Sequence, residues 1–370
     1  MRTFLTALLG AAVVFLVLAC QTENPVAVST ATPTVGAVVY AIPPTPTSTA
    51  TATPAATPTP TQVPIARPRP GALSVGLVDS ADIDLGRAPL ARQGLERAAR
   101  EFNLETLAIT SPPGDLASNA MRLAESGYGL VIIVTPYPDL AAFVAERYPQ
   151  TKFVTFGPGV QKQPPNLVSL LYAEDQAGFL AGALAGWMTK KDMVAFVGAE
   201  WTLEIVKFRK GYEHGVQYVN RQAVVLGNYV HAFSSPQKGW GEANAQLNEG
   251  ADVLFAAGGT TARGALEAAA ERHVMAIAAE SDLYDTLPKV APDLVSSALV
   301  RYDLGVYDAV KAAALNTFKA GVLTYDVTNG AIGLAPFHDW ESKVPDEAKR
   351  HLQRTLEGLQ KGTVKTDVRT

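Results

Sequence analysis

An alternation of two kinds of segment runs from residue 72 to about residue 320 and constrains the fold more than any other feature of this chain. Short apolar runs rich in Val, Ile and Leu are apolar on both faces, which is typical of buried parallel strands. Longer segments with apolar residues at helical spacing separate these runs. Strands that alternate with helices in this way predict an α/β fold with parallel sheets.

The apolar runs fall into two series of about five, which predicts two similar lobes. The first series comprises residues 72–78, 105–110, 130–135, 152–157 and 167–172. The second comprises residues 193–198, 223–230, 252–259, 274–280 and 294–300. We predict helices between them at 89–102, 116–127, 139–149, 203–220, 241–250 and 262–273. Ligands of open α/β sheets bind beyond the carboxyl ends of the strands, so we expect a site in the crevice between the lobes.

Two further helical segments are placed to carry the chain between the lobes. Residues 174–191 lead from the first series to the second, and residues 301–321 are placed to carry the chain back. We therefore assign residues 71–173 with about 320–370 to lobe 1, and residues 174–319 to lobe 2. Lobes joined by two or three such crossings can hinge and close on a ligand.

The first 20 residues have the pattern of a lipoprotein signal peptide. Arg2 precedes an almost wholly apolar stretch, residues 4–19, which is shorter than the about 20 apolar residues of a comfortable bilayer span. The sequence Val-Leu-Ala-Cys at residues 17–20 resembles the bacterial lipobox, in which the cysteine sulfur is lipidated. We expect Cys20 to anchor the protein on the extracytoplasmic face of the cell membrane; an uncleaved membrane anchor is the alternative.

Residues 21–70 form a segment of Pro, Thr, Ala and Ser with very little charge. Such a composition cannot bury enough apolar surface to offset the entropy of ordering, so we predict a disordered linker. Because Cys20 is the single cysteine, the folded part contains no internal disulfide and depends on its hydrophobic core.

Composition argues against several functional classes. The net charge of −4 is too close to neutral to suggest nucleic-acid binding. The five histidines are scattered, and no H-E-x-x-H, C-x-x-C or G-x-S-x-G pattern occurs. We therefore predict neither an enzyme nor a metal or cofactor site. An unrecognised hydrolase that uses the carboxylates of residues 79–84 and 280–282 is the alternative.

Three segments resemble the basic membrane lipoprotein (BMP) family. They are "AEDQAGFLAGALAGWMTKKDMVAFVG" (173–198), "DVLFAAGGTTARGALEAA" (252–269) and "GAIGLAPFHDW" (330–340). The resemblance implies two Rossmann-like lobes joined by a hinge, the type I periplasmic-binding fold. It also implies a monomeric extracytoplasmic lipoprotein that binds a small polar ligand, here expected to be a nucleoside, for an ABC permease. A lipoprotein that senses a ligand for a signalling receptor, or one that binds a non-nucleoside ligand, is the alternative.

The resemblance implies carboxylates that accept hydrogen bonds from ribose hydroxyls. Glu280 and Asp282 match the acidic motif of the family, although Asp282 alternatively caps the following turn. Asp79, Asp82 and Asp84 lie where the family has an acidic, glycine-rich motif, and solvated loop carboxylates are the alternative there.

Backbone N–H groups and aromatic rings complete the implied ligand site. Gly258, Gly259 and Thr260 follow a strand and begin a helix, where the backbone can approach a ligand closely; a plain tight turn is equally compatible. Rings that stack on a base contribute about 1–3 kcal/mol per base. The candidates for this aromatic clamp, each alternatively a packing residue, are Tyr137, Trp201 and Phe233.

Two positions depart from the family pattern at ligand contacts. Arg87 lies near the position of a family aromatic residue, and Val300 replaces a family lysine. Both departures affect the implied ligand site rather than the scaffold. They raise the alternative that Arg87 or Arg301 contacts an anionic or carbonyl-bearing ligand.

Overall fold

The computed structural model describes residues 65–69, 71–81 and 86–368. The predicted signal peptide with Cys20, the linker up to residue 64, and the candidates Asp82 and Asp84 lie outside the described residues. Within the range assigned to the linker, Ile65 packs on an apolar cluster of the first lobe. The backbone N–H of Arg69 donates to the Glu105 carboxylate at 3.0 Å. The folded part therefore begins before residue 71.

The first sheet is parallel throughout and has the strand order β11-β5-β4-β3-β1-β2. Its strands coincide with the first predicted series to within two residues, except for the edge strand β11, which we did not predict. The strands are β1 (Ser74–Ser80), β2 (Glu105–Ser111), β3 (Leu130–Val134), β4 (Lys152–Phe156), β5 (Leu167–Tyr172) and β11 (Gly321–Tyr325).

The second sheet has the order β12-β10-β9-β8-β6-β7. It is parallel except for β12, which pairs antiparallel with β10 and was also not predicted. The strands are β6 (Met193–Gly198), β7 (Val224–Tyr229), β8 (Val253–Ala257), β9 (Met275–Glu280), β10 (Leu294–Val300) and β12 (Ile332–Leu334). The predicted α/β fold with two lobes is confirmed.

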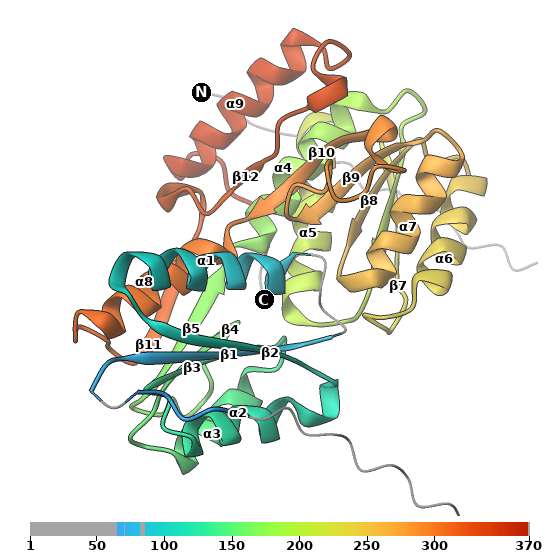
Figure 1. The fold of residues 1–370 in the computed structure, drawn as a ribbon. Coiled ribbons are helices and arrows are strands. Elements are labelled where there is room, and N and C mark those ends of the chain that lie inside the picture. The colour runs from blue at the N-terminus through green and yellow to red at the C-terminus, as the bar shows by residue number, and fades with distance from the viewer. Residues whose placement is uncertain (1–64, 70, 82–85, 369–370) are drawn as a thin grey trace, which may run out of the picture. The chain divides into compact units, whose positions relative to one another are not determined.

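Helices cover both faces of each sheet. In the first lobe α2 and α3 lie on one face and α1 and α8 on the other; in the second lobe α6 and α7 lie opposite α4 and α5 (Figure 1). The helices are α1 (Arg87–Phe102), α2 (Leu116–Glu125), α3 (Pro138–Arg147), α4 (Glu174–Met188), α5 (Leu203–Val219), α6 (Pro236–Asn248), α7 (Gly259–Glu271), α8 (Tyr302–Ala314) and α9 (Asp346–Gln360). Short 3-10 turns are η1 (Pro113–Asp115), η2 (Ala291–Asp293), η3 (Val327–Asn329) and η4 (His338–Trp340).

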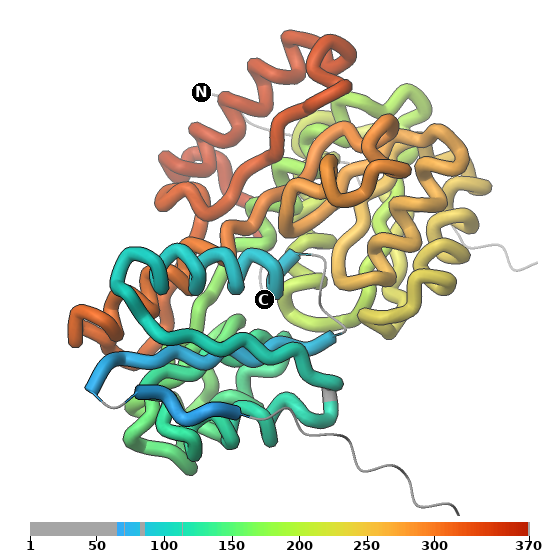
Figure 2. The backbone as a smooth tube through the Cα atoms, in the orientation of Figure 1, coloured from blue at the N-terminus to red at the C-terminus, as the bar shows by residue number. Residues whose placement is uncertain are grey.

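Between residues 86 and 368 the chain passes between the lobes three times (Figure 2). The crossings lie between β5 and α4, between β10 and α8, and between β11 and β12.

The structure differs at two points from the division into lobes that we drew from the sequence. Residues 301–321 do not form one helix of lobe 2. Instead, α8 packs on α1 of lobe 1, where a Cβ on Gly94 would lie only 2.4 Å from the carbonyl oxygen of Asp303. Residues after 330 do not belong to lobe 1, because β12 pairs with β10 and α9 packs on α4.

Helices α4 and α5 cross at the level of their backbones. A Cβ added at Gly178 or Gly182 of α4 would lie 2.2 or 2.1 Å from a carbonyl oxygen of α5. A Cβ at Gly211 or Gly215 of α5 would lie 2.0 or 2.1 Å from a carbonyl oxygen of α4. Contacts below 3.0 Å are not tolerated by real Cβ atoms, so these glycines permit the close crossing. The crossing places Asp175, in the first turn of α4, against Gly211 of α5.

Candidate functional site

Side chains from both lobes meet beyond the carboxyl ends of the parallel strands. Phe156 ends β4 and Tyr172 ends β5 in lobe 1, while Glu280 ends β9 in lobe 2. Glu204 lies in the first turn of α5, which follows β6. Arg87, the first residue of α1, extends from lobe 1 to these carboxylates. The location is the one expected for ligands of such sheets.

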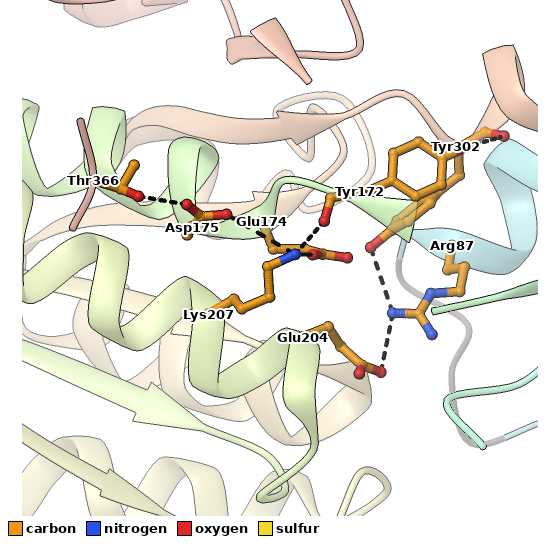
Figure 3. Close-up of polar contacts among 8 residues, drawn as sticks. All are labelled: Arg87, Tyr172, Glu174, Asp175, Glu204, Lys207, Tyr302 and Thr366. Atoms are coloured by element: carbon orange, nitrogen blue, oxygen red, sulfur yellow. Dashed lines mark hydrogen bonds and ion pairs between the residues drawn. The ribbon is translucent and has the colours of Figure 1, made fainter. Parts of the chain in front are cut away.

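Arg87 is buried, with 5% of its surface exposed, and its hydrogen bonds are incomplete. Its Nη2 donates to Glu204 Oε1 at 3.2 Å and to the Tyr302 hydroxyl at 3.4 Å (Figure 3). Its Nε is buried and has no partner among the described residues. Burial alone would lower the pKa of Arg87, but Tyr302, Glu204 and Glu280 together raise it well above its usual value. The guanidinium is therefore charged at every relevant pH.

Glu280 faces Arg87 from lobe 2 and is buried. Its backbone has a φ of 75°, a left-handed conformation that is uncommon for a residue with a side chain and marks many functional sites. Burial raises the pKa of Glu280, and the charge and the backbone N–H of Arg87 act in the opposite direction. A Cβ on Gly86 would lie 2.5 Å from Glu280 Oε2, so the glycine allows α1 to approach this carboxylate.

A second charged group, centred on Lys207, lies beside the group around Arg87, and it is more closely paired. Lys207 Nζ donates to Glu174 Oε2 at 2.6 Å and to the Tyr172 carbonyl oxygen, and lies 3.9 Å from Asp175 Oδ1 (Figure 3). Asp175 in turn accepts from the Thr366 hydroxyl at 2.6 Å. Burial raises the pKa of Glu174, and Lys207 opposes this effect. Lys207 is thus matched by its own carboxylate.

Aromatic rings of lobe 1 form a wall of the site. The Phe156 and Tyr172 rings lie 5.6 and 4.7 Å from the Tyr302 ring, both edge-on. The Arg87 Cζ lies 5.1 Å from the centre of the Tyr302 ring, within the range of a cation–π contact. Only about 10 Å³ of space remains among these side chains, about the minimum that one water needs. In this conformation the space has no room for a solute larger than a water molecule.

Asp79 is paired outside this cluster. It is the last but one residue of β1 and is 1% exposed. Its Oδ2 accepts a hydrogen bond from Arg92 Nε at 2.7 Å and lies 2.6 Å from Arg92 Nη2. This pair joins β1 to α1 within lobe 1 and accounts for the burial of the Asp79 carboxylate.

Asp282 and Arg301 also have partners of their own. Asp282 accepts from His338 Nε2 at 2.8 Å and from the Tyr284 backbone N–H at 3.2 Å, which fits its alternative role as a turn cap. Arg301 makes two hydrogen bonds to Asp303, at 2.8 and 2.7 Å. Neither lines the space around Arg87.

The two candidate glycines lie next to Glu280. Gly258 and Gly259 have φ values of 102° and 53°, begin α7, and line a small buried space with Glu280. A Cβ on Gly258 would lie 2.6 Å from the Ala199 Cβ, so packing by itself requires glycine there. Thr260 lies on the outer side, in a surface depression with Trp240.

The three aromatic candidates do not line the space around Arg87. Phe233 is 9% exposed and packs near Gly258. Trp201 is 71% exposed and stacks on Tyr229 with ring centres 6.3 Å apart, and Tyr137 is 55% exposed.

Sequence reasoning missed most of the residues that surround Arg87. Each of them lies at the carboxyl end of a strand that we predicted correctly, or within nine residues after it. Those positions were the only signal that the sequence offered. The missed residues are Phe156, Tyr172, Glu174, Glu204, Lys207 and Tyr302.

Comparisons with known proteins place the chain in a family. Residues 72–363 match the model of the Bmp family, described as ABC transporter substrate-binding protein PnrA-like. Basic membrane protein A2 of Borrelia garinii is 24% identical over 288 residues, which cover 75% of this chain and 82% of that protein. A lipoprotein of Pyrococcus horikoshii is 28% identical over 270 residues, 68% of this chain and 65% of that protein.

The fold is shared with solved solute-binding proteins. An ABC transporter solute-binding protein from Aeropyrum pernix superposes with a TM-score of 0.69 at 22% sequence identity, over 79% of this chain and 92% of that one. Within the described part of the chain, no helix combines the length and the apolar character that a membrane crossing needs. The chain therefore belongs to the Bmp family of PnrA-like substrate-binding proteins of ABC transporters.

Proposed function

We propose that this chain is a lipid-anchored receptor that captures a small polar solute between its lobes and delivers it to an ABC permease. The observation that supports this most is the buried charged cluster around Arg87, which lobes 1 and 2 build together beyond the carboxyl ends of both sheets. Buried charges that are only partly paired are costly in a purely structural role and are common at binding sites.

Capture and release follow from the hinge. With the lobes apart, Arg87 and the carboxylates of lobe 2 are hydrated and accessible. A solute favours closure only through contacts that it makes in the closed form and not in the open one. Contacts to Arg87 on one lobe and to Glu204 or Glu280 on the other meet this requirement. The permease then recognises the closed form, and the solute leaves unchanged, without any catalysed step.

A nucleoside is the second candidate solute, because Glu280 and the backbone at Gly258 and Gly259 lie together and offer acceptors and donors to a ribose. Arg87, at the position of an aromatic residue in the family, argues against it. A receptor that reports solute binding to a signalling partner uses the same site, and growth on the bound solute with and without the permease separates the two roles.

Native mass spectrometry of the full chain tests the proposal. We expect one small molecule per chain to co-purify, to survive gentle desolvation, and to be lost from an Arg87→Met, Glu280→Gln double variant. An Arg209→Met variant, whose arginine also pairs with a glutamate and lies 4.9 Å from an aromatic ring, is the matched control and retains the solute. A chain that retains no solute, and binds none from a broad panel, contradicts the proposal.

Lipid anchoring has its own test. We expect the wild-type chain to partition into the detergent phase of Triton X-114, and Cys20→Ser to move it to the aqueous phase. Each buried CH₂ of an acyl chain contributes about 0.8 kcal/mol, so loss of the lipid abolishes stable association. Detergent partitioning that survives Cys20→Ser would show that the apolar segment itself is the anchor.

A further inference from the structure

We infer that the solute is a zwitterion, with an anionic group that binds Arg87 of lobe 1 and a cationic group that binds Glu204 and Glu280 of lobe 2. This inference rests on the proposed function and names the chemical class of its solute. It follows from how these three side chains are paired in the closed conformation.

Among the described residues, no carboxylate lies at the distance of a charge-assisted hydrogen bond from Arg87. A guanidinium carries five N–H donors, and charge-assisted hydrogen bonds to carboxylates are typically about 2.7–2.9 Å long. Arg87 makes longer contacts, 3.2 Å to Glu204 and 3.4 Å to Tyr302, both from Nη2, and its buried Nε has no partner among the described residues. A carboxylate approaching the Nε edge would accept two parallel hydrogen bonds there.

In the described part of the chain, the carboxylates of lobe 2 have no cation besides Arg87 that is not already paired. The buried cluster contains the cations Arg87 and Lys207 and the carboxylates Glu174, Glu204 and Glu280. Lys207 is matched by Glu174 at 2.6 Å, which leaves one guanidinium for two carboxylates. The raised pKa of Glu280, caused by its burial, agrees with a carboxylate whose charge is not fully compensated. A solute ammonium between Glu204 and Glu280 would supply the missing positive charge.

The positions of the charged side chains on the two lobes determine how the solute is oriented, with its anionic group toward lobe 1 and its cationic group toward lobe 2. The anion-binding group lies on lobe 1 and the cation-binding groups lie on lobe 2, and in this conformation Arg87 and Glu204 contact each other directly. A zwitterion inserted between them replaces one interlobe ion pair by two, and so stabilises closure around itself. A neutral solute would separate Arg87 from Glu204 without offering either a charged partner, which is unfavourable in a buried site.

Calorimetric titration of the full chain with three groups of probes tests this inference. The zwitterions are the proteinogenic amino acids and γ-aminobutyrate. The single-charge analogues of leucine are 3-methylbutylamine and 4-methylpentanoate, with corresponding pairs for other amino acids that bind. The neutral probes are inosine and D-glucose. We expect at least one zwitterion to bind, and each of its single-charge analogues to bind at least about 100-fold more weakly.

Variants assign the charges to residues. We expect Arg87→Met to weaken binding of that zwitterion at least about 100-fold, and Arg87→Lys to weaken it about 10-fold, because lysine keeps the charge but loses the planar pair of donors. Arg209→Met leaves the affinity unchanged. Circular dichroism and thermal unfolding check that each variant is folded. If Arg87→Met does not fold, the affinity of Arg87→Lys and the affinities of the single-charge analogues test the inference instead.

Three results would overturn the inference. Binding of inosine or glucose that Arg87→Met does not weaken would exclude a zwitterion and leave the proposed function intact. Equal affinity for a zwitterion and its carboxylate analogue would exclude the cationic contact to lobe 2. A chain that binds no probe and retains no small molecule in native mass spectrometry would remove the proposed function as well.

Discussion

Arg87 of lobe 1 and Glu204 of lobe 2 form an ion pair at 3.2 Å, and their side chains are only 7% and 10% exposed. The two residues are 117 positions apart in the sequence and lie in helices of different lobes, α1 and α5. Removing one partner of a buried pair leaves an uncompensated charge, whereas replacing both by apolar groups is often neutral. The pair therefore links the stability of the closed form to the chemistry of the candidate site.

Glu204→Gln should destabilise the solute-free chain by about 3 kcal/mol, because Arg87 then lacks its direct carboxylate partner. Arg87→Met combined with Glu204→Gln should cost less than the sum of Arg87→Met and Glu204→Gln, with a coupling energy of about 1–3 kcal/mol. Urea unfolding measures all three. The exposed pair of Arg263 and Glu267 is the control, where Glu267→Gln changes stability by less than about 0.5 kcal/mol. Strictly additive effects would mean that Arg87 and Glu204 do not interact.

The stability contribution of Glu280 should depend on pH in a defined direction. Burial raises the pKa of this carboxyl above its value in the unfolded chain, which is about 4.3. An acid whose pKa is raised by folding contributes its full stability below its unfolded-state pKa. This contribution is lost as the pH rises through its folded-state pKa. Glu280→Gln should therefore gain stability relative to wild type as the pH rises above the unfolded-state pKa of about 4.3, and the two should converge below it. Thermal unfolding on both sides of this pH measures the difference; a difference independent of pH would contradict the burial argument.

Gly182→Ala should destabilise the chain by about 2 kcal/mol or more, because its Cβ would lie 2.1 Å from the Tyr212 carbonyl oxygen and force α4 and α5 apart. Gly241→Ala in α6 is the matched control: a Cβ there meets nothing within 4 Å, and alanine should stabilise the helix by about 0.5–1 kcal/mol. Chemical denaturation measures both. Equal effects of the two substitutions would show that the helix crossing tolerates a side chain.

Asp79→Asn should lower stability by about 2 kcal/mol and leave solute affinity within about twofold of wild type. The reason is that Asp79 is buried in a pair with Arg92 inside lobe 1, whereas we had considered it as a ligand contact from the sequence. Unfolding and solute titration on the same variant separate the two effects. A large loss of affinity without loss of stability would return Asp79 to the binding site.

The sequence predicted the scaffold much better than the site. The first ten strands are short β-branched runs whose pattern is local, and all were found to within two residues. The edge strands β11 and β12 were missed, although the edge strands β2 and β7 were found; β12 spans only three residues. We predicted one helix over residues 301–321, but the chain forms α8 and then β11. A local pattern could not show this, because β11 pairs with Leu167–Tyr172, which is distant in the sequence.

Site residues depend on pairings between distant segments, which a local pattern does not contain. Arg87 was noticed because it departs from a family motif, but its partner Glu204 gave no local signal. Asp282 and Arg301 were candidates by position, and their bonds to His338 and Asp303 became evident only in the fold. The crevice that we expected between the lobes is filled by Arg87 and its neighbours.

Capture of a solute between moving lobes is tested most directly by the distance between the lobes. Nitroxide labels at Asp139→Cys in α3 and Gln237→Cys in α6, both exposed, report this distance in a Cys20→Ser background where no other thiol is present. Pulsed electron paramagnetic resonance should show a broad distribution without solute and a single shorter distance with the bound solute, and Arg87→Met should prevent the change. An unchanged distribution at saturating solute would contradict capture between the lobes.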